Sequence, residues 1–385
     1  MSPDLNPNLT ELALKRLRLR RSVKWTRYPA DVLPAFVAEM DFPLAEPVRV
    51  ALAEAVELDD TGYAWPEAIG LAEAFAEFAE QRLGWQVDPA RVSPAPDVVG
   101  AITSVLGEIV EPGDEVVINT PVYHPFFDLI AELDCKLAEA PLVDGQLDVE
   151  AIERRFAGGA RALILCSPHN PAGTVPSRDQ LAAIADAAVR HGAWVLADEI
   201  HAPLTLPGAE HVPFLTVSEA AATRGIAFCS ASKAFNLAGM HCAQIVTASD
   251  EAATVVERLP FLATHCAHLG AIAAVAAYRE GDAWLGDVLA VLDHNRRLLT
   301  QLLAEHLPDV GYIEPQAGYL AWLDLRELDL GDDPSEALLE RGRVALSPGP
   351  QFGPQGAGFA RLNFGTSPAL LEEAVKRIAK GVGRG

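Results

Sequence analysis

The chain has 385 residues, and 30 lysines and arginines face 53 aspartates and glutamates, which gives a formal net charge of −23 at pH 7. Half of the residues are hydrophobic and 22% are charged, so the composition excludes a disordered, collagen-like or disulfide-scaffold protein. Because so negative a chain repels phosphate backbones and anionic lipid surfaces, we expect neither a nucleic-acid partner nor a membrane partner.

The N-terminal residues and the cysteines bear on the compartment. The first 21 residues lack an apolar core ahead of a small-residue cleavage site, and no run approaches the roughly 18 apolar residues of a membrane span. The five cysteines are odd in number, and none forms a Cys-x-x-Cys pair. This usage is typical of unpaired thiols in a reducing compartment. We therefore expect a cytoplasmic protein without a metal site.

Helix-length amphipathic stretches alternate with short apolar runs from about residue 45 onward. Continuous apolar strands between helices indicate a parallel sheet that helices cover on both faces. Ligands of such sheets bind beyond the carboxyl ends of the strands, so the turns that follow strands are expected to carry the site. Helices are predicted over 45–58, 68–82, 101–110 and 178–191, and strands over 115–119, 161–166, 193–197 and 226–229.

The last third of the chain has a different pattern. A long amphipathic helix is predicted over 282–306, a half-buried strand over 320–325 and a terminal amphipathic helix over 370–382. These elements indicate a second, smaller α+β domain that the N-terminal segment joins. The predicted organisation is an N-terminal segment 1–45, a large domain 46–288 and a small C-terminal domain 289–385.

Four turns that follow strands carry residues suited to chemistry. Asn170 has an amide that can donate or accept a hydrogen bond, and Asp198 ends a buried strand, where a carboxylate needs a cation or good donors. Lys233 follows small hydroxyl residues, and a desolvated lysine becomes a Schiff-base nucleophile. The helix after Pro96-Asp97-Val98-Val99-Gly100 presents free N–H groups to an anion. Each turn alone is equally compatible with a loop, a helix cap or an exposed lysine.

The order of these turns is more informative than any one of them. Asn170 precedes Asp198 by 28 residues, and Asp198 precedes Lys233 by 35. A helix N-terminus, then Asn-Pro, then Asp, then Ser-x-Ser-Lys resembles the fold-type I pyridoxal-phosphate enzymes over nearly the whole chain. Longer strings resemble the cystathionine β-lyase-like C–S lyases of the MalY/PatB type: 23–25 (VKW), 33–43 (LPAFVAEMDFP), 120–123 (TPVY), 167–173 (SPHNPAG), 198–201 (DEIH), 232–239 (SKAFNLAG) and 361–364 (RLNF).

The resemblance implies a fold and a set of partners. It implies an aspartate-aminotransferase-like α/β fold, with a mostly parallel sheet of the seven-stranded type flanked by helices, plus the smaller α+β domain. The cofactor would be pyridoxal 5′-phosphate, and the substrate a small amino acid. A homodimer with shared active sites is implied because Tyr63 matches the tyrosine that reaches the cofactor of the other subunit.

The resemblance also assigns the site residues. Lys233 would hold the cofactor covalently and then act as the general base, and Asp198 would pair with the protonated ring nitrogen. Arg361 would clamp the substrate carboxylate, with Asn170 nearby. The remaining cofactor contacts would come from Asn170 and His201 at the ring oxygen edge, Tyr123 on the ring face, and Val98, Val99 and Ser230 at the phosphate.

Three positions depart from the family pattern. Asp97 stands where glycine is usual, so its side chain is expected to point away from the phosphate or to cap the helix. His241 stands where many aminotransferases have a phosphate-binding arginine. Gly318 stands where threonine is frequent, which is compatible either with a reshaped substrate pocket or with a neutral loop change.

The implied reaction is α,β-elimination of cystathionine or another cysteine S-conjugate to a thiol, pyruvate and ammonia. The string at 198–201 favours this reading, because aminotransferases commonly have tyrosine where His201 stands. An aminotransferase remains an alternative, as does decarboxylation or oxidative deamination of an S-conjugated cysteine in a biosynthetic pathway. A regulatory binding protein that retains the fold is the alternative of another class, and the presence of Lys233 and Asp198 argues against it.

Overall fold

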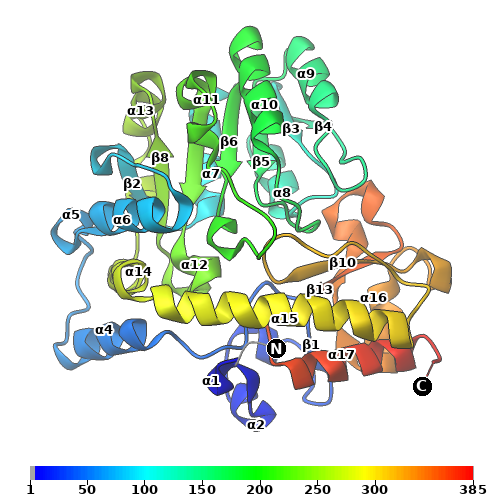
Figure 1. Cartoon of the computed structure of the whole chain (residues 1–385). Coiled ribbons are helices and arrows are strands. Elements are labelled where there is room, and N and C mark those ends of the chain that lie inside the picture. The colour runs from blue at the N-terminus through cyan, green and yellow to red at the C-terminus, as the bar shows by residue number, and fades with distance from the viewer. Residues whose placement is uncertain (1–4, 385) are drawn as a thin grey trace.

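The computed structural model describes residues 5–384, and the largest sheet among them has seven strands (Figure 1). The strand order is β2-β8-β7-β6-β5-β3-β4, and only β8 runs antiparallel to its neighbours. The predicted mostly parallel sheet is thus confirmed. Its strands are β2 (Val92–Ala95), β3 (Glu115–Ile118), β4 (Lys136–Glu139), β5 (Ala162–Cys166), β6 (Trp194–Asp198), β7 (Gly225–Cys229) and β8 (Ala243–Thr247).

Both faces of this sheet are buried. In β5, Leu163 and Leu165 belong to one hydrophobic cluster, whereas Ile164 and Cys166 belong to a second cluster on the other face. The alternation is the pleat of a strand covered on two sides, which explains its continuous apolar sequence. The helices that contribute to the two clusters include α6 (Leu71–Leu83), α7 (Val98–Ile109), α8 (Pro125–Glu132), α10 (Arg178–His191), α13 (Asp250–Glu257) and α14 (His268–Glu280).

The sequence analysis did not predict three of the seven strands, which are β2, β4 and β8. β2 and β4 are the two edges of the sheet, and β2 contains Pro94, whereas β4 exposes Lys136 and Leu137. Edge strands are not buried on both faces, so they lack the apolar run on which the prediction depended.

Capping residues explain which helix limits could be predicted. Helix α10 matches the predicted range 178–191, because Ser177 and Gln180 form a reciprocal capping box and Gly192, at φ +68°, ends the helix. The helix predicted over 68–82 is instead two helices, α5 (Pro66–Ile69) and α6 (Leu71–Leu83). Gly70 separates them at φ +74°, a conformation that favours glycine and interrupts a helix.

A smaller part of the chain contains a four-stranded antiparallel sheet in the order β12-β13-β10-β9. A parallel pair, β1 (Leu33–Pro34) with β11 (Val344–Ala345), joins the N-terminal segment to this part. Helix α15 (Asp282–His306) extends along both parts (Figure 1). It is continuous through residues 288 and 289, and the domain limits stay a prediction. Other elements include α4 (Glu46–Glu57), α17 (Pro368–Gly381), β9 (Gly311–Tyr312), β10 (Leu320–Asp324), β12 (Ser347–Pro348) and β13 (Phe359–Asn363).

Among the described residues, one segment, Phe261–Glu280, is long and apolar enough to cross a membrane, with a mean hydropathy of 1.4. The expectation that no run reaches this length is wrong by this measure. Half of the segment is buried, and its helix α14 packs against α4 and α6. This packing is typical of a core helix, so the segment is weak evidence for a membrane span.

Candidate active site

The four predicted turns lie together where the parallel strands of the large sheet have their carboxyl ends. Strands β2, β5, β6 and β7 run in the same direction, so their carboxyl ends lie together. Asn170 follows β5, Asp198 ends β6, and Lys233 follows β7 on the short helix α12 (Ala231–Ala234). Helix α7 begins directly after the turn that follows β2. The structure therefore places Asn170, Asp198 and Lys233 at the carboxyl ends of neighbouring strands.

Lys233 carries a desolvated amine. Its Nζ donates a hydrogen bond to the backbone carbonyl of Ala38 at 3.1 Å. Burial, together with the positive charge of Arg361, lowers the pKa of the amine to about 8, although the carboxylates of Asp198 and Glu39 oppose the shift. A sizeable fraction of the amine is therefore neutral near pH 8, as a nucleophile or a base requires.

Asp198 is a buried carboxylate in need of a positive partner. One of its oxygens accepts the N–H of Ile200 at 3.1 Å. Burial raises its pKa to about 6, although the Ile200 hydrogen bond and the Lys233 charge pull the other way. A carboxylate held in this way would be stabilised by a cation or by a protonated ring nitrogen.

His201, three residues after Asp198, is a buried and neutral imidazole. Burial lowers its pKa to about 3, and the charges of Lys233 and Arg361 act in the same direction. Its Nδ1 has no hydrogen-bond partner within residues 5–384. Gly318 faces the same ring, since a Cβ there would lie 3.6 Å from Nδ1, and its φ of +79° favours glycine. This backbone conformation gives a physical reason for the glycine, independent of the substrate.

Arg361 forms the far side of the site from strand β13. Its two terminal nitrogens donate to Asn170 Oδ1 at 2.9 Å, to Ser347 Oγ at 3.1 Å and to the carbonyl of Phe36 at 3.1 Å. All these partners are neutral, and Nε has no partner in the described chain. Burial lowers the pKa of the guanidinium to about 10, so it stays charged at neutral pH. A buried cation surrounded by neutral acceptors is suited to binding an anionic group.

Replacing Arg361 by alanine is expected to raise KM for an amino-acid substrate. A lost charge-assisted hydrogen bond is worth roughly 1.5–3 kcal/mol, which corresponds to about a 10- to 150-fold rise in KM. Steady-state kinetics on Arg361→Ala and Arg361→Lys will measure it, and Arg341→Ala removes an exposed arginine of the same part of the chain as the matched control. An unchanged KM in Arg361→Ala would place carboxylate binding elsewhere.

The N-terminus of α7 presents free backbone N–H groups. Asp97 is the helix cap, and its Oδ1 accepts the N–H of Gly100 at 2.8 Å, which confirms the capping prediction. The N–H groups of Val98 and Val99 in the first turn are left available to another acceptor. His241 Nδ1 lies 3.8 Å from the second Asp97 oxygen, so a protonated His241 would offset that negative charge.

Ser230 is engaged with its own neighbours. Its hydroxyl donates to the carbonyl of Cys242 at 2.6 Å and accepts the N–H of Ser232 at 3.1 Å, which caps α12. The hydroxyl of Ser232 lies 2.7 Å away. The single hydroxyl proton of Ser230 is used in the bond to Cys242, so in this arrangement the side chain caps and orients the start of α12. Ser232, present in the Ser-x-Ser-Lys string, is a further candidate for an anion contact that the sequence reasoning did not single out.

The two tyrosines have different surroundings. Tyr123 is half-buried after β3, and burial raises its pKa to about 12, with the Asp198 charge acting in the same direction. It therefore remains a neutral ring beside the charged groups. Tyr63 is fully exposed in the loop between α4 and α5. The single chain thus does not bring Tyr63 to the cluster around Lys233.

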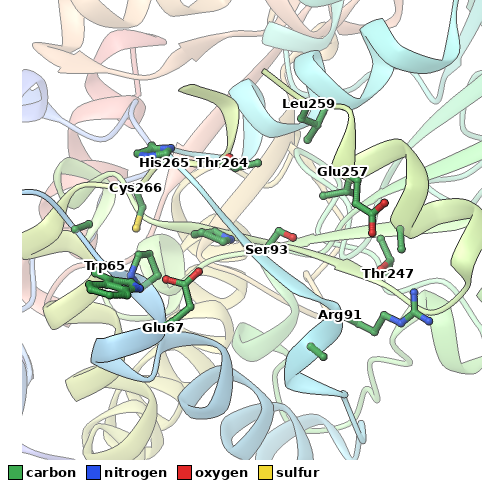
Figure 2. A pocket seen from close by; sticks show the side chains of 16 residues that line it. Trp65, Glu67, Arg91, Ser93, Thr247, Glu257, Leu259, Thr264, His265 and Cys266 are labelled. Atoms are coloured by element: carbon green, nitrogen blue, oxygen red, sulfur yellow. The ribbon is translucent and has the colours of Figure 1, made fainter. Parts of the chain in front are cut away.

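A cavity of about 530 Å³ lies apart from these residues (Figure 2). It is bordered by edge strand β2, helix α13 and the loop before α14, and its labelled side chains include Trp65, Glu67, Arg91, His265 and Cys266. None of the predicted site residues lines it. We therefore place the chemistry at the strand ends around Lys233, where the charged groups converge.

The comparisons with known proteins agree with this geometry. The family model "Aminotransferase class I and II" matches residues 40–378. A Mycobacterium tuberculosis protein provisionally named a cystathionine beta-lyase is 44% identical and covers 98% of each chain. The cystathionine beta-lyase of Corynebacterium glutamicum is 38% identical, over 95% of this chain and 98% of that one. A Corynebacterium diphtheriae crystal structure, provisionally described as a PLP-dependent beta-cystathionase, has a TM-score of 0.92 at 37% identity, over 97% and 99% of the chains.

Proposed function

Because the chain belongs to the aminotransferase class I and II family and is a pyridoxal-phosphate-dependent carbon–sulfur lyase, we propose that it cleaves cystathionine or a related cysteine S-conjugate. The products would be a thiol, pyruvate and ammonia. The observation that carries this proposal is that a desolvated amine, a buried carboxylate and a buried guanidinium lie together at the carboxyl ends of the strands in the large sheet.

The residues present fit the cofactor. The raised pKa of Asp198 reflects a carboxylate buried without adequate compensation, and a protonated ring nitrogen would supply the missing charge. Lys233 has an amine suited to a covalent bond with an aldehyde, and the first turn of α7 offers the N–H groups of Val98 and Val99 to a phosphate. We assign the remaining contacts to Asn170 and His201 at the ring edge, Tyr123 on the ring face, and Ser230 with Ser232 near the phosphate.

The mechanism follows from these positions. When bound, the cofactor withdraws the electron pair released at the substrate Cα. Arg361 binds the substrate carboxylate, and Asn170 holds the guanidinium by accepting a hydrogen bond from its Nη1. Lys233, displaced by the substrate amine and neutral, takes the Cα proton on Nζ, and the β-thiolate then departs. The remaining three-carbon fragment is hydrolysed to pyruvate and ammonia.

The test is an assay of purified, cofactor-loaded protein with L-cystathionine and a panel of S-alkylcysteines. Pyruvate, ammonia and free thiol are quantified with and without an added keto acid. Equal amounts of pyruvate and thiol without a keto acid are expected. Amino transfer only upon keto-acid addition would favour the aminotransferase alternative, and carbon dioxide release would favour decarboxylation.

We also propose a cytoplasmic homodimer in which each active site receives Tyr63 from the other subunit. The loop that carries Tyr63 exposes Trp65, and the segment before α14 exposes Phe261 and Leu262, with 69%, 72% and 77% of their surfaces accessible. So much exposed apolar surface near one loop is typical of an interface.

Mixing two inactive variants tests the shared site. Tyr63→Ala and Lys233→Ala subunits, unfolded and refolded together, are expected to regain about a quarter of wild-type activity, because half of the dimers are mixed and each holds one intact site. Lys233→Ala mixed with Asp198→Asn is the matched control, since both residues belong to one subunit's site. Equal activity in the two mixtures, or an active monomer by light scattering, would contradict the shared site.

A further inference from the structure

Residues 36–41, called the strap here, run past the end of Lys233 as part of the N-terminal segment. Side chains from separate parts of the chain bind most of the hydrogen-bonded backbone groups of the strap, and within the described structure only the N–H groups of Glu39 and Asp41 bond to backbone carbonyls. In folded proteins most backbone groups pair with other backbone groups. The side chains that bind strap backbone atoms are those of Arg20, Lys24, Lys233, Asn236, Tyr319, Ser347, Arg361 and Asn363.

The carbonyl of Ala38 is the strap atom nearest to the chemistry. It accepts the Lys233 amine at 3.1 Å and the Tyr319 hydroxyl at 2.9 Å. A carbonyl oxygen has two lone pairs, so both bonds can form together. Tyr319 is buried, at 1% exposure, and its pKa is raised by burial, so the hydroxyl keeps its proton and remains a donor.

Asn236 ties the helix of Lys233 directly to the strap. It stands three residues after Lys233, and its side-chain amide donates to the Met40 carbonyl and accepts the Met40 N–H, both at 2.9 Å. Its φ of +59° is a left-handed conformation that asparagine tolerates better than most residues. The paired bonds therefore hold the distance between α12 and the strap.

The other end of the strap is fixed by a buried ion pair. Lys24 Nζ lies 2.9 Å from Asp41 Oδ1, and their side chains are 1% and 4% exposed. The same amine donates to the Glu39 carbonyl at 2.8 Å. Asn363, two residues after Arg361, donates to the carbonyls of Val37 and Glu39 at 2.6 and 2.7 Å. The strap is thus fixed on both sides of Ala38.

We propose that the strap positions Lys233 once the substrate has displaced it, and that Tyr319 and Asn236 are positioning residues for proton abstraction. A neutral amine that donates one N–H to the Ala38 carbonyl is restricted in rotation, and its lone pair remains free to take the Cα proton. After proton transfer the ammonium keeps the same acceptor. This inference rests on the proposed role of Lys233 and extends it to residues that do not touch the substrate.

The test follows exchange of the Cα proton of L-alanine with D2O on the cofactor-loaded enzyme by NMR. Alanine has no β-leaving group, so exchange reports on Lys233 whether elimination or amino transfer is the natural reaction. Tyr319→Phe and Asn236→Gly are expected to lower the maximal exchange rate about three- to tenfold, as for a lost hydrogen bond, with half-saturating alanine changed less than twofold. Glycine is chosen at 236 because it tolerates the positive φ.

Tyr312→Phe is the matched control. It deletes the same hydroxyl from strand β9 of the small sheet, and within the described structure that hydroxyl makes no hydrogen bond to the strap. Wild-type exchange is expected in this variant. Wild-type exchange in Tyr319→Phe and Asn236→Gly as well would overturn the proposal, as would a loss in all three variants.

Amide hydrogen exchange on the cofactor-free protein gives a readout other than activity. The peptide that contains residues 36–41 is expected to exchange faster in Asn236→Gly than in wild type, because Met40 N–H loses its acceptor. The double variant is expected to lose less than the product of the single losses, since both residues act through one strap. Independent, multiplicative losses would contradict this. Absence of lyase activity in wild type with intact alanine exchange would refute only the proposed substrate class.

Discussion

Replacing Lys233 by alanine is expected to abolish elimination and the covalent bond to the cofactor together. A positioned general base contributes roughly 10²–10⁴-fold to rate, and the loss of covalent attachment adds to this, so kcat should fall by about 10⁴-fold or more. Pyruvate release measures the rate, and the visible absorption of the bound cofactor measures attachment. Lys136→Ala, which removes an exposed lysine of edge strand β4, is the matched control.

The rate at which Lys233 reacts with the cofactor is expected to depend on pH. Because the pKa of Lys233 is lowered to about 8, the reactive neutral amine is expected to appear as pH rises through about 8. The rate at which cofactor-free protein captures pyridoxal phosphate should therefore rise between pH 6 and 9 and level off above. A rate that keeps rising toward the usual lysine pKa of about 10.4 would show that the amine is not desolvated. Added methylamine should restore part of the rate of Lys233→Ala, and retained activity without it would reject the assignment.

Replacing Asp198 by asparagine is expected to leave the cofactor bound but to lower kcat about 10²–10³-fold, because the ring loses the charge that keeps its nitrogen protonated. Turnover and cofactor absorption, measured on the same preparation, separate the two effects. Glu210→Gln, an exposed carboxylate, serves as the control. A kcat near wild type would remove Asp198 from the ring nitrogen.

Although Asp198→Asn is expected to lower kcat, it is expected to raise the stability of the cofactor-free protein at pH 8. The pKa of Asp198 is raised by burial from 3.8 to about 6, so the folded protein binds this proton more tightly than the unfolded chain does. Stability therefore falls as pH rises from about 4 to about 6, and the loss above pH 6 is at most about 3 kcal/mol. Asp198→Asn should raise the Tm of cofactor-free protein at pH 8 and change it little at pH 4; an equal shift at both would contradict the burial argument.

The sequence by itself determined the strand-end chemistry of this protein. The buried strands β3, β5, β6 and β7 are apolar apart from Glu115 at the start of β3 and Asp198 at the end of β6. Asn170, Asp198 and Lys233 follow one another in the sequence at or just after the ends of β5, β6 and β7. These features are local, because strand burial and capping depend on residues a few positions apart. The same is true of Asp97, whose capping of α7 follows from its place three residues before Gly100.

Only the tertiary structure decided what holds these residues. The bond from Arg361 to Asn170 spans 191 positions, and the bond from Lys233 to Ala38 spans 195. The acceptors of the strap are backbone carbonyls, which every residue possesses, so no residue type marks them in a sequence. The edge strands β2 and β4 and the engagement of Ser230 with Cys242 were likewise set by packing between distant segments. Local sequence periodicity cannot predict such contacts, because they form only when distant parts of the chain pack together.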